Sequence, residues 1–97
     1  ISNGIEGSCF ALLVKTDPEA SPRYKGMSFF IAPKGPGFTV GKKFEKLGYK
    51  CIDSAELVFE DYRLPADHLI GEAEGNGFFQ ATGGLELGRN NVSASGV

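Results

Sequence analysis

The sequence predicts a mainly β fold, in which a small antiparallel β-barrel or sandwich domain is followed by the first helix of an α-helical domain. Between residues 8 and 62, short apolar or alternating runs are separated by proline and glycine turn signals, a pattern typical of such β domains. From Asn76 onward the apolar residues recur at steps of three and four, which is helical spacing. A chain of 97 residues holds one small domain with a modest core.

The first two strands are expected to be buried. Ser8–Thr16 is apolar on both of its alternating faces, which predicts a central strand covered on both sides. The prolines of Asp17–Lys25 predict an exposed loop after this strand. Gly26–Ala32, with the adjacent Phe29 and Phe30, predicts the second buried strand.

Two further strands are expected to complete the β region. Pro33–Gly37 predicts a turn, and Phe38–Val40 predicts a strand of about three to five residues. Ser54–Tyr62 alternates between apolar and polar residues, which predicts a strand with one side in water. Pro65 ends this strand because proline cannot donate a hydrogen bond to a ladder and restrains Leu64 before it.

The predicted helix contains glycines that oppose its own propensity. Each glycine costs about 1 kcal/mol relative to alanine in a helix interior, so another cause must favour it. Two explanations stay open: close packing of a neighbouring helix, or approach of a ligand to the backbone. The glycines concerned are Gly83, Gly84 and Gly88. Asn76 or Gly75 is expected to lie at the start of the helix.

Charge and composition exclude several classes of function. The net charge is −2, and the basic residues are spread along the chain, so no basic stripe is available for a nucleic acid. No apolar run approaches the roughly 20 residues that span a bilayer. Cys9, Cys51 and His68 are too few and too far apart for a zinc site. Cys9 is expected to be a buried small hydrophobe, Cys51 a partly exposed thiol, and His68 a surface residue or local cap.

Two charged pairs are candidates for chemistry. Glu60 and Asp61 are adjacent in a strand, so their side chains point to opposite faces and cannot converge on one bond. Glu86 and Arg89 are three residues apart in a helix and therefore share one face. From this spacing alone they are an exposed pair that contributes about 0.2 to 0.5 kcal/mol.

An ordered set of segments resembles the acyl-CoA dehydrogenase family along nearly the whole chain. The order of the segments carries the resemblance, because no single tetrapeptide among them is specific. The segments are Ile1–Gly4, Thr39–Gly41, Lys46–Lys50, ELVFEDYRLPADHLIGE at Glu56–Glu72, Gly75–Phe78, and the helix with Glu86 and Arg89. The resemblance implies that residues 1–70 form the middle β-barrel domain, and that 71–97 form a linker and the truncated start of the C-terminal helical domain. A first residue other than methionine and an uncapped helical end at Val97 also predict a fragment of a longer protein.

The resemblance implies cofactor contacts at the start of the chain. Ile1 and Ser2 are similar to the end of the Trp-Ile-Thr/Ser-Asn motif of the family, whose hydroxyl residue hydrogen-bonds the isoalloxazine ring of FAD near N5. Ser2 is expected to take that role. The tryptophan of the motif would precede residue 1.

The resemblance also implies substrate contacts on the helix. Leu85 stands where a residue lining the acyl channel is expected, while Glu86 and Arg89 stand beside the thioester and pantetheine. Glu86 occupies a position where aspartate is commoner. Gly88 occupies the position at which some members carry their catalytic glutamate, so the base is expected in the missing C-terminal domain. No catalytic base and no metal ligand is expected in this chain, which by itself should be inactive.

The implied activity is the 2,3-dehydrogenation of acyl-CoA to trans-2-enoyl-CoA with FAD as cofactor. The implied partners are the acyl-CoA substrate, an electron-transferring flavoprotein, the remaining domains of the parent chain, and further copies in a homo-oligomer. No nucleic acid and no membrane span are expected. The implied location is the cytoplasm of a bacterium or archaeon, or the mitochondrial matrix of a eukaryote. Two alternatives stay open: an acyl-CoA oxidase or related flavin oxidase of the same superfamily, and a non-catalytic β-barrel interaction module.

Overall fold

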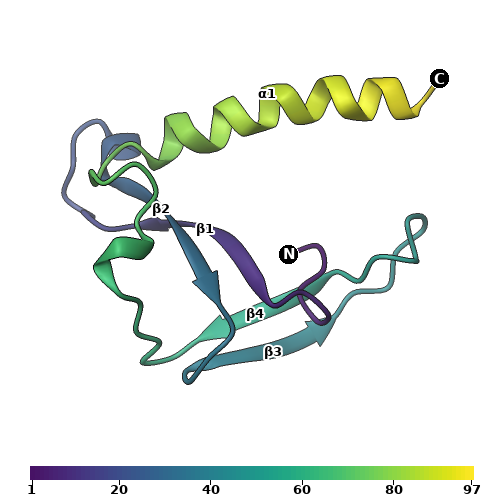
Figure 1. The fold of residues 1–97 in the computed structure, drawn as a ribbon, viewed down its shortest axis with the longest axis horizontal. Helices are drawn as coiled ribbons and strands as arrows, with labels where there is room; N and C mark the ends of the chain where they lie inside the picture. The colour runs from purple at the N-terminus through teal and green to yellow at the C-terminus, as the bar shows by residue number, and fades with distance from the viewer. The chain divides into compact units, whose positions relative to one another are not determined.

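Four strands, two short 3-10 helices and one α-helix make up the computed structural model, which describes all residues from Ile1 to Val97 (Figure 1). The strands pair two by two, β1 with β2 and β3 with β4. In chain order the elements are β1 (Cys9–Lys15), η1 (Arg23–Gly26), β2 (Met27–Pro33), β3 (Phe38–Lys43), β4 (Ala55–Phe59), η2 (Ala66–His68) and α1 (Gly77–Ser95). The prediction of a mainly β region followed by one helix is confirmed, while closure of the strands into a barrel stays a prediction.

The chain divides into two compact units, which are described separately below. Unit 1 consists of Ile1–Phe10 and Ala32–Pro65, and unit 2 of Ala11–Ile31 and Ala66–Val97. None of the helices combines the length and the apolar character that crossing a bilayer requires.

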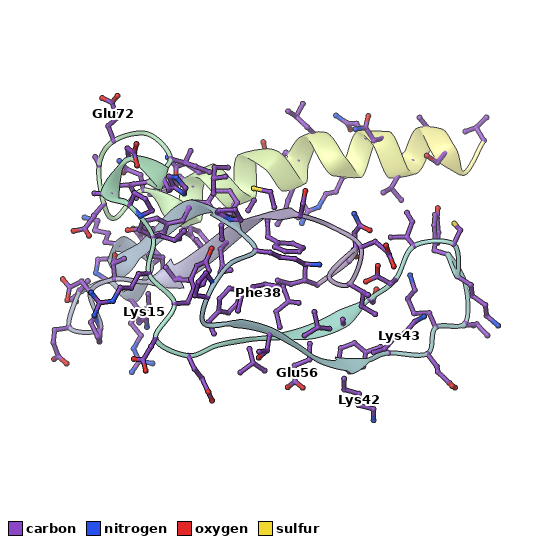
Figure 2. The ribbon with its side chains drawn as sticks, turned by 60° about the horizontal axis from the view of Figure 1, so that its bottom comes forward. Lys15, Phe38, Lys42, Lys43, Glu56 and Glu72 are labelled. Carbon is purple, nitrogen blue, oxygen red and sulfur yellow. The ribbon has the colours of Figure 1, made fainter.

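Unit 1 is organised around the antiparallel pair β3–β4. Phe38 lies opposite Phe59, and their rings meet edge to face with centroids 5.3 Å apart. The Phe10 ring also stacks on the Phe38 ring, with centroids 5.6 Å apart, and Ala55 is fully buried. Glu56 is exposed and projects into solvent (Figure 2). One face of β4 is therefore exposed to solvent, as the alternation of its residues predicts.

Two strand ends differ from the prediction for identifiable reasons. β3 extends beyond the expected Val40 to Lys43, because an irregularity in the register between these residues lets pairing resume opposite Ala55. β4 ends at Phe59 and not at Tyr62, because Asp61 adopts a φ of 49°, which is incompatible with an extended strand. The Tyr62 hydroxyl instead donates a hydrogen bond to the carbonyl of Pro33, and partial burial raises the pKa of this phenol.

Unit 2 holds the start of α1 against β2 through one buried serine. Ser28 is 1% exposed, its Oγ lies 2.7 Å from Oγ1 of Thr16, and it accepts the Gly75 N–H at 3.0 Å. Gly77, the first residue of α1, approaches the Ser28 backbone so closely that an added Cβ would lie 2.6 Å from the Ser28 carbonyl carbon. Asn76 is the N-cap, so the predicted start of the helix is confirmed.

Aromatic side chains extend this contact within unit 2. The Tyr24 ring of η1 lies 5.5 Å from the Phe78 ring and 5.6 Å from the Phe79 ring, measured between centroids. His68, at the end of η2, is half-buried, and its Nδ1 lies 3.1 Å from the carbonyl oxygen of Ile31.

The prediction of a central β1 with a buried Cys9 is wrong. Cys9 and Ala11 are exposed, whereas Phe10 between them is only 7% exposed. Apolar residues on both faces of a segment predict burial on both sides, but β1 pairs with β2 alone and Cys9 stays exposed. Cys51 is exposed as expected, and neither cysteine forms a disulfide.

Candidate functional site

The N-terminal segment of unit 1 is bonded to the residues that lead into β4. Ser2 forms an antiparallel bridge with Ser54. The backbone nitrogen of Ile1 donates to the Ala55 carbonyl at 2.6 Å, and the Ala55 N–H donates back to the Ile1 carbonyl at 3.0 Å. Ser2 is therefore fixed by its neighbours, while its own exposed hydroxyl makes no hydrogen bond within the chain.

A turn at 3–7 follows this bridge, and the carboxylate of Asp53 organises it. Oδ1 of Asp53 accepts the Ile5 N–H at 2.8 Å, and Oδ2 accepts the Glu6 N–H at 3.3 Å. The carbonyl of Asp53 also accepts the Asn3 N–H at 2.7 Å. Asn3 has a φ of 59°, a conformation that asparagine tolerates better than most residues.

These contacts lower the pKa of Asp53 below its ordinary value of 3.8. The largest cause is the hydrogen bond from Ile5, which outweighs the opposing effect of desolvation; the Glu6 N–H and the charges of Lys43 and Lys34 lower the pKa further. Local sequence pattern does not single out Asp53. Aspartate is prone to accept backbone N–H groups in turns, but its partners lie 48 and 47 residues away in sequence, so local pattern could not name them.

Acidification is expected to release this turn. A carboxyl group whose pKa is lowered by folding stabilises the folded state above its ordinary pKa, and this contribution disappears as the pH falls through the lowered value. We therefore expect the amide NMR signals of Ile5 and Glu6 to titrate with a midpoint below 3.8. The same signals in Asp53→Asn should not follow that titration. A midpoint at or above 3.8 in the wild-type chain would contradict the hydrogen-bonded geometry.

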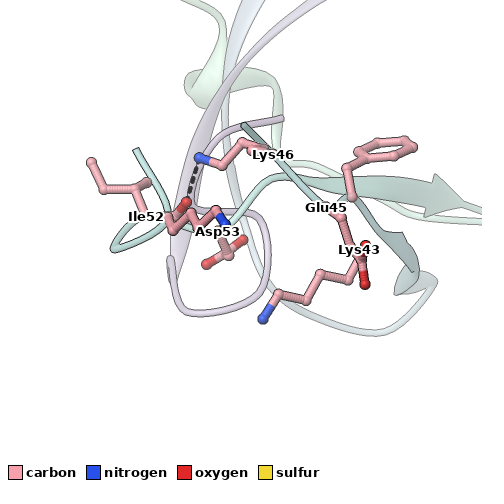
Figure 3. A pocket seen from close by; sticks show the side chains of 7 residues that line it. Lys43, Glu45, Lys46, Ile52 and Asp53 are labelled. Carbon is pink, nitrogen blue, oxygen red and sulfur yellow. Dashed lines mark hydrogen bonds between the residues drawn. The ribbon is translucent and has the colours of Figure 1, made fainter. Parts of the chain in front are cut away.

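An open pocket of about 560 Å³ lies beside this region in unit 1 (Figure 3). The ammonium of Lys46 donates to the carbonyls of Tyr49, at 2.8 Å, and Ile52, and so holds the turn at one side of the pocket. The lining residues are Lys43, Phe44, Glu45, Lys46, Lys50, Ile52 and Asp53. Neither Ile1 nor Ser2 lines it, so this pocket is not the cofactor contact that the resemblance implies.

The three candidate substrate residues lie on α1, in unit 2. Leu85 is 59% exposed, and Glu86 and Arg89 are also exposed. Glu86 and Arg89 form no ion pair, so the favourable contact expected of an isolated helical pair is absent. The helix thus leaves the polar groups of both side chains free of partners within the chain.

The space around the glycines of α1 is also unoccupied. Apart from its chain neighbours and the backbone of the helix itself, a Cβ added at Gly83, Gly84 or Gly88 would meet no atom within 4 Å. No element of this chain accounts for them, so packing of a helix and approach of a ligand both stay predictions. The candidate residues fall into two sets that are described separately: Ile1 and Ser2 in unit 1, and Leu85, Glu86 and Arg89 in unit 2.

No protein-family model matches the chain, but curated proteins do. The isovaleryl-CoA dehydrogenase, mitochondrial, of Pongo abelii is 39% identical over 90 residues, which cover 92% of this chain and 21% of that protein. The short-chain specific acyl-CoA dehydrogenase, mitochondrial, of Rattus norvegicus is 39% identical over 98 residues, which cover 100% of this chain and 23% of that protein.

Solved structures resemble the chain in both sequence and fold. The acyl-CoA dehydrogenase of Geobacillus kaustophilus matches with a TM-score of 0.77 and 41% identity over 84% of this chain and 21% of that chain. A chain in a structure described as the electron transferring flavoprotein of Acidaminococcus fermentans matches with a TM-score of 0.74 and 41% identity, over 82% of this chain and 20% of that one. The chain spans about a fifth of the length of these relatives.

Proposed function

The chain belongs to the acyl-CoA dehydrogenase family, and from this premise we propose that the full-length protein converts acyl-CoA thioesters to trans-2-enoyl-CoA with FAD as its cofactor. The observation that supports the proposal is the similarity to acyl-CoA dehydrogenases, which covers the whole chain in sequence and 84% of it in fold. In this proposal, residues 1–70 belong to the middle β domain, and 71–97 to a linker and the start of the C-terminal helical domain. The position of all four strands before residue 60 and of α1 after residue 76 is consistent with these boundaries.

The proposed FAD contact involves Ile1 and Ser2. The Ser2 hydroxyl is exposed and unbonded within the chain, so it has a donor and an acceptor available for a polar edge of the flavin ring. Ile1 is 52% exposed and offers apolar surface beside it. The Ser2 hydroxyl and the apolar surface of Ile1 together fit a flavin edge. Bound FAD would supply the hydride acceptor of the reaction.

Ser2→Ala in the full-length protein is expected to weaken FAD binding by about 1 to 2 kcal/mol, because one hydrogen bond near the reactive part of the flavin is lost. Flavin reduction should slow as well. The melting temperature of the apoprotein should stay at the wild-type value, because the hydroxyl makes no hydrogen bond within the chain. Fluorescence titration with FAD measures the affinity, and an unchanged affinity together with an unchanged reduction rate would mean that Ser2 is only a turn residue.

The proposed substrate contacts lie on α1. Leu85 lines the acyl channel, Glu86 contacts the pantetheine, and Arg89 lies beside the thioester. A carboxylate from the remainder of the C-terminal domain removes the α-proton, and Gly88 leaves room for it. The positive charge of Arg89 favours the ionised form of that base and stabilises the charge that develops on the thioester carbonyl. The exposure of Leu85, Glu86 and Arg89 on one helix supports this assignment, since a site must leave its contacts free for the substrate.

The proposed electron acceptor is an electron-transferring flavoprotein, and the similarity to a chain in a structure of such a protein supports this choice. An oxidase of the same superfamily is the second candidate, since the chain shows nothing of how reduced flavin would meet oxygen. Turnover of acyl-CoA by the full-length protein separates them. A dehydrogenase should reduce the electron-transferring flavoprotein without consuming oxygen, whereas oxygen consumption with hydrogen peroxide formation would favour the oxidase. Absence of both would favour a non-catalytic module.

Location and assembly follow from the family as proposals. Both curated relatives are named as mitochondrial, so the matrix is the proposed location in a eukaryote and the cytoplasm in a bacterium or archaeon. We propose that the full-length protein is a homo-oligomer. Its mass in solution, measured by light scattering, checks this directly.

A further inference from the structure

We propose that Asp53 and Lys34 clamp the turn next to Ser2 and are positioning residues for its flavin-facing hydroxyl. The inference rests on the flavin contact proposed for Ser2. Neither residue is offered as a contact to the cofactor. Both act through the backbone of the N-terminal segment in unit 1.

Asp53 and Lys34 hydrogen-bond the two backbone polar groups of one residue of the turn, Ile5. The Ile5 N–H donates to Oδ1 of Asp53 at 2.8 Å, and the Ile5 carbonyl accepts a hydrogen bond from the ammonium of Lys34. Hydrogen bonds to ionised groups are stronger than those between neutral groups, and here a negative charge faces the donor and a positive charge faces the acceptor. The orientation of the Ile5 residue is thereby fixed.

The turn has little other support. Its own hydrogen bond runs from the Gly7 N–H to the Asn3 carbonyl at 2.8 Å. Asn3 holds a left-handed conformation with a φ of 59°, which asparagine tolerates but which is still less favourable than the ordinary regions. Without the Asp53 carboxylate, the Ile5 and Glu6 N–H groups would also lose their partners within the chain.

The turn transmits this restraint to Ser2 through Asn3. The Asn3 N–H donates to the Asp53 carbonyl at 2.7 Å, one residue after Ser2 and one residue before Ser54, the partner of Ser2 in the bridge. The backbone and the side chain of Asp53 therefore hold both sides of the Asn3–Glu6 turn. A turn that opens would free Asn3 and leave Ser2 held only through the Ile1–Ala55 hydrogen bonds, so its backbone and its hydroxyl would be less restrained.

Lys34 is itself held in place by aromatic rings. Its ammonium lies 6.0 Å from the centroid of the Phe10 ring and 5.8 Å from that of Phe38, at cation–π range. The two rings stack on each other, and the same ammonium donates to the Ile5 carbonyl in the turn. Asp53 and Lys34 are thus a matched pair of opposite charges on two different segments, with the turn between them.

The test uses the full-length flavin-loaded protein and two pairs of variants. Asp53→Ala is paired with Glu45→Ala, which removes a neighbouring exposed carboxylate that makes no hydrogen bond. Lys34→Met keeps the apolar stem and removes the charge; it is paired with Lys42→Met on an exposed lysine of β3. We expect the Kd for FAD to rise about tenfold in Asp53→Ala and about threefold in Lys34→Met, with no change in either control. The visible spectrum of the bound flavin should shift in both test variants, and the KM for acyl-CoA should not change.

A rescue variant and a double variant separate positioning from general stability. Asp53→Asn keeps one oxygen that can accept the Ile5 N–H, so it should recover most of the affinity. If Asp53→Ala does not fold, Lys34→Met carries the test, and wild-type FAD affinity and spectrum in that variant would overturn the clamp. If Asp53 acts through Ser2, then Asp53→Ala added to Ser2→Ala should weaken FAD binding by no more than about twofold beyond Ser2→Ala alone. Wild-type affinity and spectrum in Asp53→Ala, or effects of the two substitutions that simply multiply, would overturn the clamp. Wild-type FAD affinity and flavin reduction rate in Ser2→Ala would instead overturn the flavin contact on which the clamp rests.

Discussion

Replacing Arg89 with glutamine in the full-length protein is expected to lower kcat/KM by about tenfold to a hundredfold, which corresponds to about 1.4 to 2.7 kcal/mol of transition-state stabilisation. In the proposed site, glutamine would keep hydrogen-bonding capacity but lose the fixed positive charge that is proposed to favour the ionised base and the polarised thioester carbonyl. The melting temperature should hardly change, because Arg89 is exposed and forms no ion pair with Glu86. Steady-state kinetics with acyl-CoA, together with a thermal melt, measures both quantities.

Two matched variants show whether the loss belongs to this position. Arg63→Gln removes another exposed arginine, outside the helix, and should leave kcat/KM unchanged. Glu86→Gln should act mainly on KM, because a pantetheine contact is made equally in the ground state and the transition state. Wild-type kinetics in Arg89→Gln would mean that Glu86 and Arg89 are a solvated pair, and would remove the substrate site from α1 while leaving family membership intact.

Gly77→Ala is expected to destabilise the fold by about 2 to 3 kcal/mol, toward the upper end of what overpacking costs. The added Cβ would lie 2.6 and 2.7 Å from backbone atoms of Ser28 and 2.8 Å from the Leu13 side chain. Backbone in a paired strand cannot move aside as a flexible side chain can, so the start of α1 would have to shift. Chemical denaturation of the chain, followed by circular dichroism, measures the free energy of unfolding.

Gly84→Ala is the matched control for that change. It lies in the same helix but has no atom within 4 Å of the added Cβ, so in the isolated chain it should raise helix stability by up to about 1 kcal/mol. Equal destabilisation by both substitutions would show that the close approach to Ser28 does not determine where α1 begins. A Gly84→Ala variant that is stable as the isolated chain but inactive in the full-length protein would favour an approaching ligand or helix at that position.

Local pattern predicted the elements that depend on neighbouring residues. The change of period at Asn76 marks the helix start correctly, and the alternation after Ser54 marks β4 and its wet face. The extension of β3 to Lys43 could not be predicted in this way, because it depends on a register irregularity opposite Ala55. The prediction that Cys9 is buried is wrong for a related reason: an apolar segment does not reveal how many neighbouring strands cover it.

Only those candidate site residues could be predicted whose role follows from the residue type at a position of the family pattern. The resemblance named Ser2, Glu86 and Arg89, and the structure shows all three exposed and without side-chain partners in the chain. Asp53 and Ser28 could not be found, because each gains its role from partners about 47 residues away. The turn-rich sequence around Asp53 predicts only a loop. The role of Asp53 appears only in the folded chain, where the N-terminal segment lies against it.

Anaerobic addition of saturated acyl-CoA to the full-length flavin-loaded protein tests the proposed activity most directly. The flavin absorbance in the visible range and the enoyl-CoA product are followed together, with short, medium, long and branched acyl chains as substrates. If the protein is an acyl-CoA dehydrogenase, at least one of these thioesters should bleach the oxidised flavin and yield an equal amount of trans-2-enoyl-CoA. Flavin that stays oxidised with every one of them, in a protein that binds FAD stoichiometrically, would contradict the proposed activity.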